Sequence, residues 1–269
     1  MTEGTTILRE GVRLNLDVGG AGRPVVFQHG LGGDRRQTAD VFPGDDGFGR
    51  MTLECRGHGL SEAGDPSRFS IATFAEDLAA VIEARRLAPV AIGGISMGAA
   101  IALRLAVRRP DLVGALMLVR PAWITAAAPE NMRPNAEVGA LLARMSPGEA
   151  HEAFLSGETA RRLADDSPDN LASLEGFFAR PDSAVTAALL QRISAGGPGV
   201  AEDEVRGIDV PALIVGCGRD VVHPWDHARM LAGLIRGAQL VEVTSKSDNR
   251  DRYRQEVRHA IGDFLRRAA

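Results

Sequence analysis

Six short apolar runs, separated by segments with helical spacing, limit the folds open to this chain more than any other feature. The runs cover residues 25–28, 51–53, 90–95, 115–119, 212–215 and 240–243. Continuous apolar runs, in contrast to alternating ones, are typical of parallel strands that are buried on both faces. The predicted helices cover residues 73–85, 97–108, 227–235 and 252–266. We therefore predict an α/β fold with a doubly wound, mostly parallel sheet.

Two parts of the chain depart from this rhythm. Residues 7–9 and 13–18 alternate in polarity and predict two further strands at an antiparallel edge. Residues 121–206 have helical spacing and several prolines but no buried-strand run. We predict that this segment is a helical cap inserted after the sixth strand, with residues 1–120 and 207–269 forming the α/β core. A cap above the strand ends would act as a lid that shapes a pocket.

The composition excludes several classes of protein. With 45% apolar residues the chain can bury a large core, yet no apolar run approaches the roughly 20 residues that span a bilayer. A formal charge of −4 provides no broad basic surface for nucleic acid. Residues 1–10 lack a cationic segment followed by an apolar one, so we expect a cytoplasmic protein. Cys55 and Cys217 lack metal-ligand spacing and are expected to be buried hydrophobic residues, and no metal or organic cofactor is indicated.

The pentapeptide 94–98, Gly-Ile-Ser-Met-Gly, predicts a sharp turn between a buried strand and a helix. Crowding two residues before and two residues after the serine makes glycine necessary at both flanks. The helix that follows would direct free N–H groups and a partial positive charge at an oxyanion formed beside Ser96. We therefore assign Ser96 as the nucleophile, and a serine that only caps the helix is the alternative.

A second glycine-rich segment, His-Gly-Leu-Gly-Gly at 29–33, directly follows the strand predicted at 25–28. Glycines allow such a loop to approach another backbone closely, so one of its N–H groups can act with that of Met97 as an oxyanion hole. We choose Leu31 as this second donor. His29 stands at the buried end of the strand and is expected to be structural.

These motifs and two others resemble the α/β-hydrolase superfamily over essentially the whole chain. They occur in the family's order: His-Gly-Leu-Gly at 29–32, Glu-Cys-Arg-Gly-His-Gly-Leu-Ser at 54–61, the pentapeptide at 94–98, Gly-Arg-Asp at 218–220, and a closing amphipathic helix. The chain is most similar to the capped bacterial branch, which includes esterases, lactonases, enol-lactonases and cofactor-free haloperoxidase-like proteins. The resemblance implies a small-molecule substrate and a Ser, acid, His triad in that chain order.

The resemblance identifies the acid of that triad but not the base. Asp220 follows the strand predicted at 212–215 and would orient and stabilise a protonated base, with a surface aspartate as the alternative. The family's histidine belongs in the loop at 244–251, and this loop contains none. His223 would serve as the base only if the loop after Asp220 departs from the family's usual course. His259 lies in the last helix and is expected to face solvent.

Lys246, the single lysine among 31 basic residues, occupies the loop in which the family carries its histidine. A lysine acts as a general base when burial lowers its pKa, but a nearby carboxylate opposes this. We therefore expect an ion pair between Lys246 and Asp220. Arg120 follows the strand predicted at 115–119 and leads to Trp123, so both side chains are expected to line the pocket. Arg120 and Lys246 together suggest an anionic substrate, with a surface position of Arg120 as the alternative.

The residues leave three functions open. The first is a serine-nucleophile hydrolase for a small ester, lactone or thioester, with Ser96, Asp220 and the N–H groups of Leu31 and Met97 as its machinery. The second is a pseudohydrolase that binds an anionic small molecule without turnover, because no base activates Ser96. The third is a lyase or cofactor-free enzyme that uses the oxyanion hole to stabilise an enolate.

Overall fold

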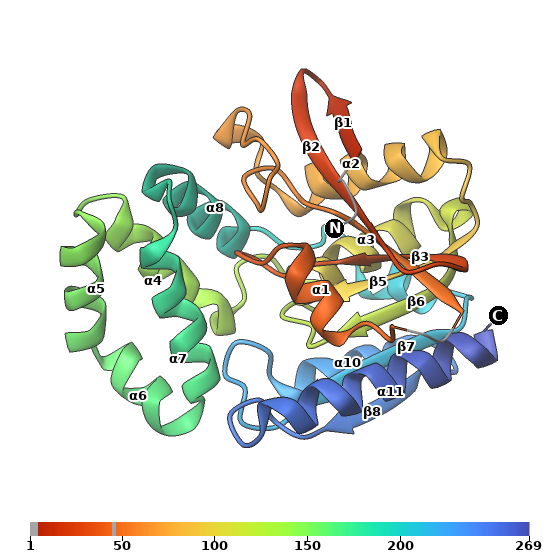
Figure 1. Cartoon of the computed structure of the whole chain (residues 1–269). Coiled ribbons are helices and arrows are strands. Elements are labelled where there is room, and N and C mark those ends of the chain that lie inside the picture. Colours follow the sequence, from red (N-terminus) through yellow and green to blue (C-terminus); the bar gives the residue numbers. More distant parts are fainter. Residues whose placement is uncertain (1–4, 45–46, 269) are drawn as a thin grey trace.

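One eight-stranded sheet forms the centre of the molecule (Figure 1). The computed structural model describes residues 5–44 and 47–268. The strands are β1 (Thr5–Arg9), β2 (Val12–Gly19), β3 (Arg23–Gln28), β4 (Phe48–Leu53), β5 (Val90–Ile95), β6 (Val113–Val119), β7 (Ala212–Cys217) and β8 (Gln239–Val243). Their order across the sheet is β1-β2-β4-β3-β5-β6-β7-β8. The β1–β2 and β2–β4 pairs are antiparallel and the others are parallel, which confirms the predicted sheet and its antiparallel edge.

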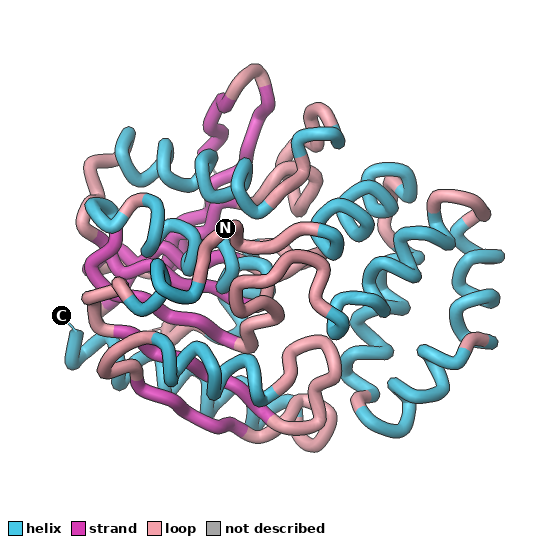
Figure 2. Tube along the Cα trace, turned by 180° about the vertical axis from the view of Figure 1, so that it is seen from behind, coloured by secondary structure: helices cyan, strands magenta, loops and turns pink. Residues whose placement is uncertain are grey.

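Helices cover both faces of this sheet (Figure 2). Helices α2 (Ile71–Ala84), α3 (Met97–Arg108) and α10 (Trp225–Leu234) share one apolar cluster, and α11 (Arg250–Ala268) and residues at the end of α1 (Arg35–Val41) share another. Successive side chains of a strand point to opposite faces. In β6, Leu116 and Leu118 accordingly join the first cluster, whereas Met117 and Val119 join the second. No helix within the described ranges has the length and apolar composition needed to cross a membrane.

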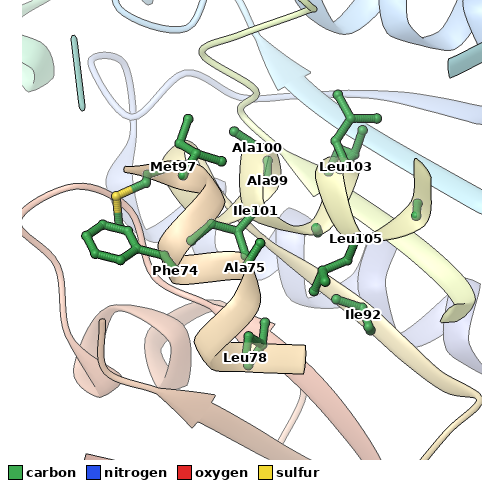
Figure 3. Packing of buried hydrophobic residues seen from close by; sticks show 14 of the residues in the cluster. Phe74, Ala75, Leu78, Ile92, Met97, Ala99, Ala100, Ile101, Leu103 and Leu105 are labelled. Atoms are coloured by element: carbon green, nitrogen blue, oxygen red, sulfur yellow. The ribbon is translucent and has the colours of Figure 1, made fainter. Parts of the chain in front are cut away.

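The buried face of α3, the helix after β5, consists largely of small residues, which permit close packing against its neighbours. Figure 3 shows Ala99, Ala100 and Ile101 of α3 beside Phe74 and Leu78 of α2. All of these side chains are at most 3% exposed. This dense packing fixes the start of α3, and with it the turn that joins the helix to β5.

A group of helices lies between β6 and β7 and beside the sheet (Figure 1). Its members are α4 (Arg133–Leu142), α5 (Pro147–Ser156), α6 (Glu158–Asp166), α7 (Pro168–Glu175), α8 (Ser183–Ala195) and α9 (Glu202–Arg206). Prolines stand in the first turn of α4, α5 and α7, where a missing N–H costs no helical hydrogen bond. The group has an apolar cluster of its own, which includes Phe154, Leu163 and Leu190. The boundaries of the cap at residues 121 and 206 remain a prediction.

Helix α1 is the element of the core that the sequence analysis missed. It has seven residues and begins at Asp34, whose carboxylate accepts a hydrogen bond from the N–H of Arg36. Such a short helix shows too little periodicity to be recognised, and its stability comes from tertiary contacts with the sheet and α11.

Candidate active site

Ser96 occupies a strained turn between β5 and α3. Its backbone has φ 55° and ψ −109°, a region that costs a residue with a side chain about 1–3 kcal/mol. The side chain makes no capping hydrogen bond with the helix, so the capping alternative is wrong. The N–H of Ser96 donates to the carbonyl oxygen of Val119 at 3.0 Å, which ties the strained residue to the neighbouring strand.

Two glycines make this turn possible. A Cβ atom added at Gly94 would lie 2.6 Å from the carbonyl carbon of Gly98, and one added at Gly98 would lie 2.4 Å from the carbonyl oxygen of Gln28. Both contacts are with backbone, which has little room to move away. Only glycine therefore fits at both flanks, as the pentapeptide predicts.

Two backbone N–H groups beside Ser96 are available to a ligand. Among the residues that the structure describes, neither the N–H of Leu31 nor that of Met97 has a hydrogen-bond partner. The loop that carries Leu31 passes close to the serine, since a Cβ atom added at Gly30 would lie 3.4 Å from the Cβ atom of Ser96. Unpartnered backbone donors are rare inside proteins, and a pair of them next to a nucleophile is the chemical requirement for an oxyanion hole.

Asp220 and His223 form a hydrogen-bonded pair in the loop after β7. His223 approaches Asp220 Oδ1 through two atoms, with its Nδ1 at 2.8 Å and its backbone N at 3.0 Å. The side chain of Asp220 is only 1% exposed, so the alternative of a surface aspartate is wrong. A carboxylate at Nδ1 fixes the proton there and leaves the lone pair on Nε2, the form that can accept a proton.

Burial lowers the pKa of His223 below its ordinary value, although the charge of Asp220 acts in the opposite direction. The imidazole is therefore neutral near pH 7, as a general base requires. For Asp220 burial alone would raise the pKa, but the charge of Arg120 and the hydrogen bonds from His223 outweigh it and hold the pKa far below the usual range. The carboxylate thus stays ionised and can stabilise a protonated His223.

The helical group between β6 and β7 holds this loop in place. From α7, Asn170 Oδ1 accepts a hydrogen bond from the N–H of Val222 at 2.9 Å. The Ser167 hydroxyl donates to the carbonyl oxygen of Arg219 at 2.9 Å, and Asn131 Nδ2 donates to that of Val222 at 2.6 Å. Backbone groups on both sides of Asp220 are therefore anchored by segments that are distant in sequence.

These groups meet at one cavity of about 270 Å³. Its lining includes Ser96, Leu31, His223, Lys246 and Arg120. No hydrogen bond joins Ser96 to His223 among the residues described here; contacts between catalytic groups often tighten only when substrate binds. No group of three or more His, Cys, Asp or Glu side chains in the described ranges is arranged to hold a metal ion.

A family model described as "alpha/beta hydrolase fold" matches residues 23–247. The chain belongs to the α/β-hydrolase fold family. It is 27% identical over 241 residues to "Putative carbamate hydrolase RutD" of Rhizobium rhizogenes, which covers 84% of this chain and 87% of that relative. The structural resemblance extends over almost the full length, and the chain is an enzyme of the hydrolase type.

Two solved structures illustrate this likeness. The enol-lactonase from Burkholderia xenovorans LB400 matches with a TM-score of 0.72 and 25% identity, covering 97% of this chain and 100% of the other. A thermophilic esterase from Thermogutta terrifontis matches with a TM-score of 0.76 and 21% identity, covering 99% of each chain. At 21% identity, the likeness to the thermophilic esterase shows only that the two proteins share a fold.

The α/β-hydrolase fold places Lys246 at the cavity, but the predicted ion pair with Asp220 is wrong. Asp220 Oδ2 is instead occupied by Arg120, whose Nε and Nη2 atoms both lie at 2.6 Å. Lys246 forms no hydrogen bond or ion pair with any described residue, and its Nζ lies 5.1 Å from the ring centroid of Tyr253. Arg120, at the end of β6, is the better partner for this carboxylate than a lysine, because its planar guanidinium can offer two donors at once.

The structure also corrects the predictions for the segment after β6. Arg120 lines the cavity as predicted, but it is buried, and its charge is neutralised by Asp220 and by Asp169 at 3.3 Å. Its alternative position on the surface is wrong. Trp123 does not line the cavity: its side chain is buried in the core, and its Nε1 donates to the carbonyl oxygen of Gly196 at 3.1 Å.

The remaining histidines lack a role at the cavity. His29 Nε2 accepts a hydrogen bond from the N–H of Cys55, and its Nδ1 lies 2.8 Å from the carbonyl oxygen of Gly30, so both ring nitrogens are used in structure. His259 is 77% exposed and pairs with Asp263, as expected for the solvent face of α11. The sequence analysis missed Arg180 and Asn135, two cavity residues from the helical group, because nothing in their local sequence indicates which way they point.

Proposed function

We propose that this α/β-hydrolase is a serine-nucleophile enzyme in which His223, held by Asp220, replaces the missing histidine of the loop after β8. The substrate class is a small ester, lactone or thioester, and anionic members of that class fit the cationic lining of the cavity. The observation that carries the proposal is the Asp220–His223 contact of 2.8 Å in a cavity that also contains Ser96.

The chemistry follows from these roles. Ser96 Oγ attacks the carbonyl carbon while its proton moves to Nε2 of His223, and Asp220 stabilises the imidazolium that forms. The N–H groups of Leu31 and Met97 donate to the oxygen that becomes negative. His223 then returns the proton to the leaving group, and water releases the acyl group by the same steps in reverse. The relatives named for carbamate and enol-lactone hydrolysis support attack at a carbonyl carbon.

The test is labelling by a fluorophosphonate probe, read by mass spectrometry of the modified peptide. We expect stoichiometric labelling at Ser96 in the natural chain, none in Ser96→Ala, and labelling slowed by roughly 10²-fold or more in His223→Gln. His259→Gln is the matched control, since it removes an exposed imidazole and should label at the natural rate. Absence of label in the natural chain would overturn the proposal.

The other two functions predict different outcomes of the same experiment. A pseudohydrolase needs a serine without a base, and the pair formed by Asp220 and His223 argues against it. A lyase or cofactor-free enzyme that uses the oxyanion hole alone would turn over its substrate in Ser96→Ala. Retained turnover in that variant, without labelling of the natural chain, would favour this third function.

A further inference from the structure

The cavity at Ser96 has a strongly one-sided set of charges. Its lining contains Arg120, Arg180 and Lys246 but no aspartate and no glutamate among the residues that the structure describes. Arg120 is compensated, because Asp220 and Asp169 lie within 3.3 Å of its guanidinium. Arg180 and Lys246 have no carboxylate within 4 Å among the residues described. The walls of the cavity therefore carry positive charge that the protein itself does not balance.

The two uncompensated cations differ in how many of their N–H donors remain free for a ligand. Arg180 donates to the carbonyl oxygens of Gly32 and Gly57, both at 2.8 Å, and to the Thr186 hydroxyl at 3.2 Å. Three of its five N–H donors are used to join the loops after β3 and β4 to the helical group. Lys246 donates to no described residue, so its three N–H bonds are free for a ligand.

The residues around Lys246 hold its ammonium group at the cavity without neutralising its charge. Its Nζ lies over the ring of Tyr253, a neutral surface that attracts a cation. Tyr253 is fully buried on α11. The guanidinium carbon Cζ of Arg120 also lies over this ring, 5.6 Å from its centroid. A half-buried ammonium group that lines a cavity and has no carboxylate within 4 Å among the described residues is a site for an anion from outside the protein.

A third polar group in the lining is available to a ligand. Asn135 on α4 is only 6% exposed, and its Oδ1 is buried without a hydrogen-bond partner among the described residues. A buried amide oxygen without a donor is unusual, and it can accept a hydrogen bond from a polar group of a ligand. Asn135 therefore offers a neutral polar contact in the cavity, and the positive charge free for an anion comes from Lys246.

We infer that Lys246 binds a carboxylate of the substrate, so that the preferred substrate is a small carboxylate-bearing ester, lactone or thioester. This inference rests on the proposed function for the position of the reacting carbonyl at Ser96, but not for the binding of the anion. Lys246 acts as a specificity-determining residue: it holds the far end of the substrate and takes no part in proton transfer.

Binding by Lys246 depends on pH in a direction that can be worked out. Burial lowers the pKa of Lys246 to about 8, with Arg120 and Arg250 acting in the same direction and Asp169 and Asp220 against it. The other groups facing it, His223 and Tyr253, are neutral near pH 7 because burial lowers the pKa of His223 and raises that of Tyr253. Only the protonated amine attracts a carboxylate, so KM for a carboxylate-bearing substrate should rise as pH increases through about 8.

The experiment compares monomethyl esters of succinate, glutarate and adipate with the corresponding dimethyl esters, with methanol release as the readout. The two members of each pair differ by one methyl group that removes the charge. For the best monomethyl ester we expect Lys246→Met to raise KM by about 10- to 100-fold with little change in kcat, because an interaction of equal strength before and during reaction affects binding alone. KM for the dimethyl ester should not change, and Lys246→Arg should restore part of the loss.

Arg236→Met is the matched control, because it removes one positive charge from an exposed side chain outside the cavity. An equal change of KM for the monomethyl and dimethyl esters in Lys246→Met, or no change for either, would overturn the inference. Calorimetric titration of succinate into Ser96→Ala separates this result from a failure of the proposed function. If the natural chain hydrolyses no ester, succinate binding that is lost with Lys246→Met and kept with Arg236→Met still supports Lys246, and binding unaffected by Lys246→Met refutes it.

Discussion

The loops after β7 and β8 reach the same cavity but contribute different chemistry to it. The loop after β7 carries Asp220 and His223, which contact each other, whereas the loop after β8 carries Lys246, whose ammonium group lies over the ring of Tyr253 and has no hydrogen bond or ion pair with a described residue. The family resemblance implies one acid in the first loop and one base in the second. The comparison teaches that a carboxylate and a histidine can pair within one loop while a neighbouring cation, here Arg120, binds the other oxygen of the carboxylate.

The strongest way to break this comparison is to remove the base from the first loop. We expect His223→Gln to lower kcat/KM for a neutral ester such as dimethyl succinate by about 10²- to 10⁴-fold, with no loss of melting temperature. In the natural chain kcat/KM should fall only when pH drops below the ordinary pKa of histidine, because burial lowers the pKa of His223 and the neutral form is the active one.

This acid limb of the pH profile should be absent from the residual activity of His223→Gln. Steady-state kinetics between pH 5 and pH 9 check both expectations. The exposed variant His259→Gln provides the control, and equal activity of the two variants would contradict the role of His223.

A second way to break the comparison is to remove Arg120, the cation that binds the same carboxylate as His223. Arg120→Met leaves buried Asp220 with neutral His223 alone and buried Asp169 with the exposed Arg250 alone, so we expect the free energy of unfolding at pH 7 to fall by about 3–5 kcal/mol. Urea titration measures this change. The exposed variant Arg236→Met should stay within about 0.5 kcal/mol of the natural chain.

The sign of the pH dependence distinguishes loss of the ion pair from loss of packing. The depressed pKa of Asp220 contributes stability that is present above the pKa of an unfolded aspartate, about 3.9, and is lost as pH falls toward the folded value. The difference in stability between the natural chain and Arg120→Met should therefore shrink as pH falls below about 4. A difference that stays constant over that range would assign the effect to packing.

A double variant that moves the histidine from the first loop to the second sharpens the comparison, and we expect it to have the smallest effect. In His223→Gln/Lys246→His, Asp220 Oδ1 loses the imidazole of residue 223, and a histidine stands at the position that the family resemblance implies. We expect kcat/KM for dimethyl succinate to recover by about tenfold relative to His223→Gln, because a general base is worth at least that much. No recovery in a variant with an unchanged melting temperature would mean that the second loop cannot deliver a base to Ser96.

Much of the site followed from local sequence. The turn at Ser96 could be predicted because its flanking glycines stand within five residues of the chain, although the backbone that excludes side chains there belongs partly to Gln28 of β3. The free N–H groups of Leu31 and Met97 are expected because a glycine-rich loop and a helix start each leave backbone donors unpaired. Asp220 is predicted as the acid by the family resemblance, together with its position after a buried strand.

The pairing of charges could not be predicted in this way. Arg120 and Lys246 both follow strands that end near Asp220, and their sequences do not reveal which of the two reaches the carboxylate. The difference arises from the reach and the donor geometry of each side chain, and from Asp169 of α7, which also contacts Nη2 of Arg120.

By itself, the sequence determined the sheet, the helices that cover it, and the turn at Ser96, because apolar periodicity and the glycines that flank the serine can be recognised within a few neighbouring residues. Only the tertiary structure decided that Arg120 pairs with Asp220, that His223 binds the same carboxylate, and that Lys246 has no counter-ion among the described residues. Electrostatic partners are determined by distance and burial in space, and segments that are far apart in the sequence meet at this one cavity.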